Sequence, residues 1–185
     1  MDGMPPPAYK EEFPMKKVLS LLLVVCMMIP VFALAEEASA VVIGQTQYAA
    51  HGTKCFAVLT VAMEGDTIVA AHIDEYQFMS AETSVGVPNS DADFGTNFPE
   101  GMVLASKRVN NEAYSANMAG AGSTVALADN YAAIEAFVTG KTVADLEAEI
   151  EGKTAEDMVD AVSGCTLVDT LGYVQGLIEA AKAAQ

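Results

Sequence analysis

Residues 53–78 read TKCFAVLTVAMEGDTIVAAHIDEYQF, and this stretch decides the fold. Two runs rich in Val, Ile, Thr, Tyr and Phe flank a short turn-forming segment at residues 64–66, which is the pattern of a β-hairpin. In the first run, the two alternating sets of side chains are both largely apolar. We therefore expect that strand to lie in the centre of a sheet and to be covered on both faces.

The segments on either side of the hairpin differ in composition. Residues 40–52, AVVIGQTQYAAHG, have the composition of a strand that leads into the hairpin. Residues 79–102 are rich in Gly, Pro, Asn, Asp and Ser, so that we expect an ordered loop that is long enough to be functional. For residues 103–127 we expect a short helix followed by a loop.

The second half of the chain carries helix-start signals. Asp129 is expected to cap a first helix, which Gly140 ends. The Thr-x-x-Asp patterns at residues 142–145 and 154–157 have the spacing of capping boxes, and the last helix is expected to begin at about Asp169. A sheet-forming half followed by a helical half predicts an α+β fold: a single domain in which an antiparallel sheet from the first half is packed by helices from the second.

Residues 15–35, MKKVLSLLLVVCMMIPVFALA, predict a secretory signal peptide. Two lysines precede a long apolar run, and the run ends in a small-x-small cleavage site at Ala35. An uncleaved anchor helix is the alternative, but the run is near the short end for a membrane span and Pro30 interrupts it, which favours cleavage. Cleavage after Ala40 is a second option.

Residues 1–14 form an acidic, proline-rich leader that is atypical in front of a signal peptide. Within it, the segment Lys-Glu-Glu at residues 10–12 can be encoded by a purine-rich bacterial ribosome-binding sequence, a short spacer before Met15. We therefore expect Met15 to be the true start and residues 1–14 to be untranslated sequence read in frame. The mature domain then spans residues 36–185, exported from the cytoplasm and without stable membrane insertion.

The chain is strongly acidic, with 9 Lys and Arg against 25 Asp and Glu and a formal net charge of −16. The three lysines and three acidic residues of the first 35 positions balance each other, so that the mature domain also carries −16. Such a charge repels nucleic acid and anionic lipid, which excludes these as partners. Two cysteines remain after cleavage, Cys55 and Cys165. They are a disulfide candidate in an exported chain, and two buried free thiols are the alternative.

The segment DAVSGCTLVDT, residues 160–170, is the main candidate for a functional site. Ser163 to Thr166 form the turn before the last expected helix, and free backbone N–H groups at a helix N-terminus favour an anionic oxygen. Gly164 permits a tight turn or a close approach to a ligand. The Thr166 hydroxyl can cap the helix or serve as an attachment point. From the residues alone, phosphate binding and a plain helix cap both fit.

The sequence DAVSGCT resembles the flavinylation motif of the FMN-binding domain family. In that motif an Asp, two variable residues, Ser or Thr, a small residue, Ala and Thr follow in order, and a flavin transferase joins FMN through its phosphate to the last Thr. The resemblance implies that Thr166 is the acceptor, with Asp160, Ser163 and Gly164 forming the motif around it. Cys165 stands where the family has Ala, and Asp169 brings a carboxylate near the phosphate position.

A second segment, AETSVG at residues 81–86, resembles the Glu-Thr loop that lies near the flavin in the same family, with Glu82 and Thr83 matching. The resemblance implies an extracytoplasmic electron carrier with covalent FMN, whose partners are a flavin transferase and a redox protein. The alternative is a flavin-free, disulfide-braced domain of the same fold that binds a small ligand or a partner protein.

Other chemistry-bearing residues carry weaker patterns. His51 is expected in a turn and His72 in a strand, and with the two cysteines they match no zinc spacing, so that no metal site is predicted. Asp74 and Glu75 are expected to be solvated carboxylates, since no calcium-loop spacing is present.

Overall fold

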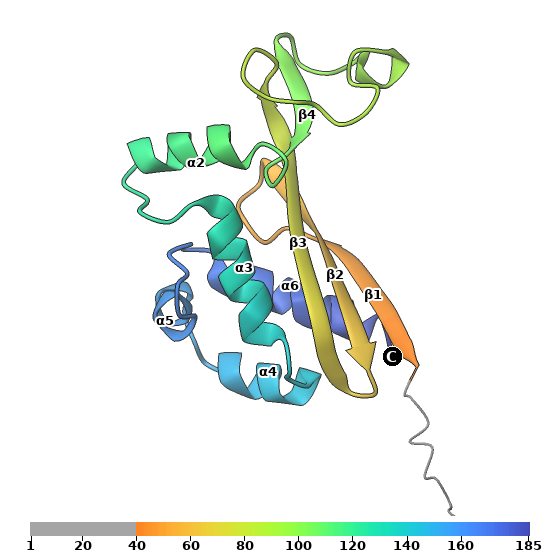
Figure 1. Ribbon diagram of the computed structural model, residues 1–185, viewed down its shortest axis with the longest axis vertical. Helices are drawn as coiled ribbons and strands as arrows, with labels where there is room; N and C mark the ends of the chain where they lie inside the picture. Colours follow the sequence, from red (N-terminus) through yellow and green to blue (C-terminus); the bar gives the residue numbers. More distant parts are fainter. Residues whose placement is uncertain (1–39) are drawn as a thin grey trace, which may run out of the picture. The chain divides into compact units, whose positions relative to one another are not determined.

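The computed structural model describes residues 40–185, and the predicted leader and signal peptide lie outside the described residues. The first half of the described chain forms a four-stranded antiparallel sheet in which the strands pair in chain order (Figure 1). The strands are β1 (Val41–Tyr48), β2 (Cys55–Glu64), β3 (Thr67–Ser80) and β4 (Met102–Ser106). The second half supplies the helices, and the described residues 40–185 belong to one compact unit. The predicted α+β domain is confirmed.

The hairpin predicted for residues 53–78 is present, formed by β2 and β3. Glu64 pairs with Thr67, so that the turn between β2 and β3 consists of two residues. Gly65, the first of them, has a φ of 58°. Two-residue hairpin turns need positive φ, which glycine adopts without steric cost.

The helices begin largely where the capping patterns place them. They are α2 (Asn111–Gly120), α3 (Leu127–Val138), α4 (Val143–Ile150), α5 (Ala155–Ala161) and α6 (Thr170–Lys182), with a single 3-10 turn, η1 (Asp93–Gly95), in the loop after β3. The capping boxes of α4 and α5 are both formed, with Thr142 and Thr154 as N-cap residues. Because each box needs only residues three positions apart, its sequence pattern is sufficient to predict it.

The prediction that Asp129 caps α3 is wrong. The helix begins earlier, with Ala126 as its N-cap residue and without a side-chain cap of its own. Its first N–H groups are instead bonded by α2: Leu127 N donates to Ser115 Oγ at 2.9 Å, and Ala128 N donates to Asn111 Oδ1 at 2.8 Å. Side chains of the neighbouring helix α2 therefore supply the hydrogen-bond acceptors that an N-cap residue normally supplies.

The prediction that β2 is covered on both faces is also wrong. Ala57, Leu59 and Val61 of β2 are buried against the helices, but Phe56 on the opposite face is 36% exposed. Within residues 40–185, α6 packs on β1 and β2, and α3 packs on β3, so that the helices cover one face of the sheet (Figure 1). The approach of α6 is close, because a Cβ at its Gly172 would fall on the backbone carbonyl of Ala50.

The strand β4 is absent from the sequence predictions, which placed a helix and loop after residue 102. β4 pairs with the last five residues of β3, from Tyr76 to Ser80. The segment between them, residues 81–101, is the ordered loop that the composition predicts, with many backbone hydrogen bonds of its own. A strand of five residues at a sheet edge carries little pattern, and its pairing depends on the exposed edge of β3.

Candidate functional site

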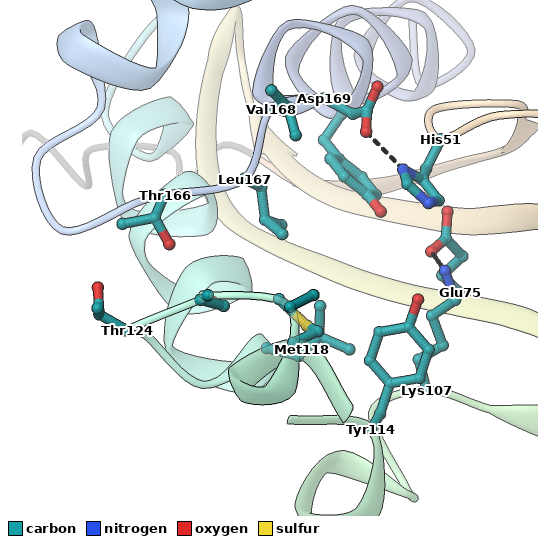
Figure 2. Close-up of a pocket in the computed structure, with 15 residues that line it drawn as sticks. His51, Glu75, Lys107, Tyr114, Met118, Thr124, Thr166, Leu167, Val168 and Asp169 are labelled. Carbon is teal, nitrogen blue, oxygen red and sulfur yellow. Dashed lines mark hydrogen bonds and ion pairs between the residues drawn. The ribbon is translucent and has the colours of Figure 1, made fainter. Parts of the chain in front are cut away.

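The fold encloses a cavity of about 480 Å³ on the helical side of the sheet. Its walls come from the loop after β1, from β3, from the segment after β4, from α2, from residues 121–124 and from the segment that leads into α6. Figure 2 shows Thr166 and Thr124 at one end of this pocket and Glu75 and Lys107 at the other. Ligand pockets in proteins usually measure about 300–1,000 Å³, so that the size suits a small organic molecule or a cofactor.

The far end of the pocket holds a buried ion pair. The carboxylate of Glu75, from β3, accepts a hydrogen bond from Lys107 Nζ, and the two side chains are 0% and 1% exposed. Tyr131 Oη lies 3.4 Å from the same oxygen, Glu75 Oε2, and the Lys107 ammonium lies 4.8 Å from the centre of the Tyr114 ring. Glu75 Oε1 has no hydrogen-bond partner among the described residues.

The electrostatics of this end keep Lys107 charged and the neighbouring phenols neutral. Burial works to lower the pKa of Lys107, but the charge and hydrogen bond of Glu75 outweigh it, and the pKa lies above its ordinary value. Burial, followed by the charge of Glu75, raises the pKa of Tyr131. Burial, followed by the nearby Tyr131 and Glu75, raises the pKa of Tyr173. The pocket therefore ends in a charged pair within low-dielectric surroundings.

The near end of the pocket is organised by Asn130, a completely buried residue of α3. Its Oδ1 accepts hydrogen bonds from Thr166 N at 2.6 Å and from Thr166 Oγ1 at 3.3 Å. Its Nδ2 donates to the carbonyl oxygens of Val125 and Ala126. Asn130 thus ties the Thr166 turn to the start of α3 and sets the direction of the Thr166 side chain.

Asp169 does not present a free carboxylate to this end of the pocket. Its Oδ2 lies 2.5 Å from Nδ1 of His51, which belongs to the loop between β1 and β2 (Figure 2). Although Asp169 is the N-cap residue of α6, within the described chain its side chain bonds none of the N–H groups in the first turn of that helix. The helix N-terminus is consequently left without a side-chain acceptor.

The other residues of the Asp-to-Thr motif shape the turn and do not line the pocket. Asp160 is an exposed residue in the last turn of α5, and Ser163 is exposed as well. Gly164 has a φ of 85°, and Cys165 N donates to the carbonyl oxygen of Val162 at 3.0 Å, which closes a tight turn. The positive φ at the third position of that turn is the conformation that glycine supplies.

The structure does not bring the Glu-Thr loop to the pocket. Glu82 and Thr83 are exposed in the loop after β3, beyond the end of the sheet that β4 completes (Figure 1). This loop is attached to the start of α2, where Asn110 Oδ1 accepts from Val85 N at 2.7 Å and Asn110 Nδ2 donates to Val85 O at 2.9 Å. Of the two segments that carry the family resemblance, the pocket therefore includes only the one with Thr166.

Cys55 and Cys165 are free thiols in the described chain. Cys55 Sγ donates to the carbonyl oxygen of His51 at 2.6 Å, and Cys165 Sγ lies 3.1 Å from Thr170 Oγ1. The structure does not join the two cysteines, and their disulfide stays a prediction.

Cys55 is expected to react slowly with iodoacetamide at pH 8 in the folded protein. Burial, followed by the charge of Glu75, raises the pKa of this thiol from 9.0 to about 11. A rise of this size lowers the fraction of reactive thiolate about 100-fold. The measurement is the alkylation rate at Cys55, read by peptide mass spectrometry in native protein and in urea. Equal rates would contradict the raised pKa, and reactivity that appears only after reduction would reveal the predicted disulfide.

Glu75 is the site residue that the sequence analysis assigned wrongly. The expectation of a solvated carboxylate fails because Glu75 follows Ile73 by two positions and shares its buried face of β3. A charged residue at an inward position of a strand requires a partner. The alternation along β3, which puts Glu75 on the face of Ile73, was therefore the signal in the sequence that Glu75 is buried and paired. The partner, Lys107, lies 32 positions away and has no pattern of its own.

The fold and the site define a class: an α+β domain with a sheet covered by helices on one face and a pocket that runs from a threonine turn to a buried ion pair. No protein-family model, no curated protein and no solved structure matches this chain. The family resemblance therefore rests on the two motifs quoted above.

None of the helices in residues 40–185 combines the length and apolar character that a membrane span requires. In the same part of the chain, no group of three or more His, Cys, Asp and Glu side chains is placed to hold a metal ion.

Proposed function

We propose that this protein carries FMN, joined through its phosphate to Thr166, and passes electrons outside the cytoplasm. The observation that carries the proposal is the position of Thr166. The residue that the motif selects as the acceptor lies on the wall of the 480 Å³ pocket, oriented by the buried Asn130. Ser163 and Gly164 lie in the turn that presents it, and Asp160 lies in the last turn of α5 just before.

The chemistry of the pocket suits a flavin. Met118, Leu127 and Leu167 supply an apolar wall, Tyr114 supplies an aromatic ring, and polar groups are confined to the two ends. The N-terminus of α6, which begins four residues after Thr166, has no side-chain cap and offers N–H groups and a positive dipole end to a phosphate. Asp169 is engaged by His51, which reduces its repulsion of that phosphate. Bound FMN supplies the redox chemistry, and the chain supplies position and electrostatics.

The attachment needs an activated donor, in which the FMN phosphate is linked as a pyrophosphate to a leaving group. The Thr166 oxygen forms the new bond to phosphorus and its hydroxyl proton is released, while the leaving group departs with the electrons of the broken P–O bond. A flavin transferase is the partner for this step. For electron transfer, the net charge of −16 suits a basic redox protein through weak, salt-sensitive contacts. The predicted signal peptide places these partners outside the cytoplasm.

An intact mass of the protein, co-expressed with a flavin transferase, tests the attachment. We expect an FMN-sized addition on the wild type and none on Thr166→Ala. Thr124→Ala is the matched control, because Thr124 lines the same end of the pocket and has no place in the motif. This control should carry the same addition as the wild type.

An unmodified wild-type mass would overturn the proposal and favour the flavin-free binding domain. An addition that persists on Thr166→Ala would show that another residue is the acceptor.

A further inference from the structure

The far end of the pocket contains an acceptor without a donor. Glu75 is completely buried, and its Oε2 accepts a hydrogen bond from Lys107 and lies near the Tyr131 hydroxyl. Its second oxygen, Oε1, has no hydrogen-bond partner in the described chain, and the side chain lines the pocket. Buried carboxylate oxygens are normally hydrogen-bonded, because their desolvation is otherwise not compensated. An unpaired carboxylate oxygen beside a cavity is a group that a donor on a ligand can satisfy.

A hydrogen-bond donor, the ammonium group of Lys107, lies beside this acceptor. Lys107 carries three N–H groups, and its one charged hydrogen-bond partner is Glu75. Lys107 also lines the pocket, and Figure 2 shows its ammonium next to the Glu75 carboxylate. The pair therefore presents one acceptor and one donor side by side at one end of the pocket.

We propose that Glu75 and Lys107 recognise the imide edge of a heteroaromatic ring. The ring N–H donates to Glu75 Oε1, and the adjacent ring carbonyl accepts from Lys107 Nζ. The inference rests on the proposed function, because the ring is taken to be the flavin of the FMN at Thr166. Attachment at Thr166 brings that ring into the same pocket. The two residues then determine which rings the pocket accepts, while Thr166 determines attachment.

Burial makes this recognition selective. In a site built around a hydrogen bond, a ligand that lacks the donor leaves the carboxylate oxygen desolvated and unpaired. Hydrogen bonds to charged groups are stronger than neutral ones, so that loss of the N–H weakens binding by about 10- to 100-fold.

The experiment separates ring recognition from attachment. Thr166→Ala protein, which lacks the proposed acceptor, is titrated with lumiflavin and with lumiflavin methylated at the imide nitrogen, and binding is read from flavin fluorescence. We expect lumiflavin to bind at least about 10-fold more tightly than its methylated form. The two rings differ only at the N–H that Glu75 is proposed to accept.

A second variant, Glu75→Gln in the same background, tests whether Glu75 is the residue that discriminates. The Lys107 ammonium requires an acceptor, so that the amide oxygen of Gln turns toward Lys107 and the NH₂ group faces the pocket. The amide NH₂ group and the ring N–H are then two donors that face each other and cannot form a hydrogen bond. We therefore expect lumiflavin to lose its advantage over the methylated form. Glu64→Gln, the same substitution at an exposed position outside the pocket, should keep that advantage. Thermal unfolding of each variant verifies that it is folded.

Equal binding of the two rings would overturn the inference, and so would a preference that survives Glu75→Gln. If neither ring binds, the inference also fails, but an FMN addition on wild-type Thr166 would leave the proposed function standing with its ring outside this pocket. Selective ring binding without any FMN addition would keep the inference and refute the covalent attachment.

Discussion

Replacement of Lys107 by Met is expected to lower the free energy of unfolding by about 3–5 kcal/mol. Lys107 and Glu75 are 1% and 0% exposed, and each is the charged partner of the other. Removal of the ammonium leaves a buried carboxylate with Tyr131 Oη, at 3.4 Å, as its remaining donor. Met has nearly the length of Lys without its charge, so that the variant removes the interaction and retains most of the packing. Urea denaturation at pH 7 measures the loss.

The double variant Glu75→Gln with Lys107→Met is the control for this prediction. It removes both charges, and the cost of an uncompensated buried charge disappears with them. We expect it to recover most of the stability that the single variant loses, because a buried pair is often replaceable as a unit. A single Lys107→Met variant within about 1 kcal/mol of the wild type would show that the pair is hydrated and not buried.

Asn130→Ala is expected to lower the free energy of unfolding by about 2–4 kcal/mol and to reduce FMN attachment at Thr166. The side chain is completely buried and bonds both Thr166 and the carbonyl oxygens of Val125 and Ala126. Truncation leaves the Thr166 N–H without its acceptor and opens a small cavity, and each effect is destabilising. The Val125 and Ala126 carbonyls lose one donor each but keep Ser123 Oγ and Asn130 N. Attachment falls because the acceptor hydroxyl loses the group that orients it.

Asn117→Ala is the matched control for this second prediction. Asn117 is an exposed residue of α2, and the same substitution there should change stability by less than about 0.5 kcal/mol. Urea denaturation gives the stability of both variants, and intact mass gives the extent of attachment. If Asn130→Ala matches Asn117→Ala in its free energy of unfolding and in its extent of FMN attachment, Asn130 has no role in the site.

The features that the sequence predicted correctly are those that depend on residues close together in the chain. The turn of the β2–β3 hairpin depends on Gly65, and the starts of α4 and α5 depend on a Thr and an Asp three positions apart. The last helix, α6, begins at Thr170, next to the expected start at about Asp169, although Asp169 makes no side-chain cap. Local turn geometry and capping hydrogen bonds determine these elements, and tertiary packing does not alter them.

The candidate site was predictable only in part. The Asp-to-Thr motif selected Thr166, which lies in the pocket, and the separate Glu-Thr segment selected Glu82 and Thr83, which lie elsewhere. The sequence assigned no role to Asn130 and treated Glu75 as a surface carboxylate. A motif identifies residue types in order, whereas the walls of a pocket are chosen by how distant elements pack.

The sequence by itself determined the α+β class, the hairpin, the capping boxes of α4 and α5 and the strongly acidic charge. The tertiary structure decided which face of the sheet is covered, where β4 pairs, and which side chains meet around the pocket. His51 and Asp169 are 118 positions apart, and Glu75 and Lys107 are 32 positions apart. Such contacts form only after the helices have packed on the sheet, because hydrogen bonds and ion pairs act over a few ångströms. No local pattern in the chain encodes them.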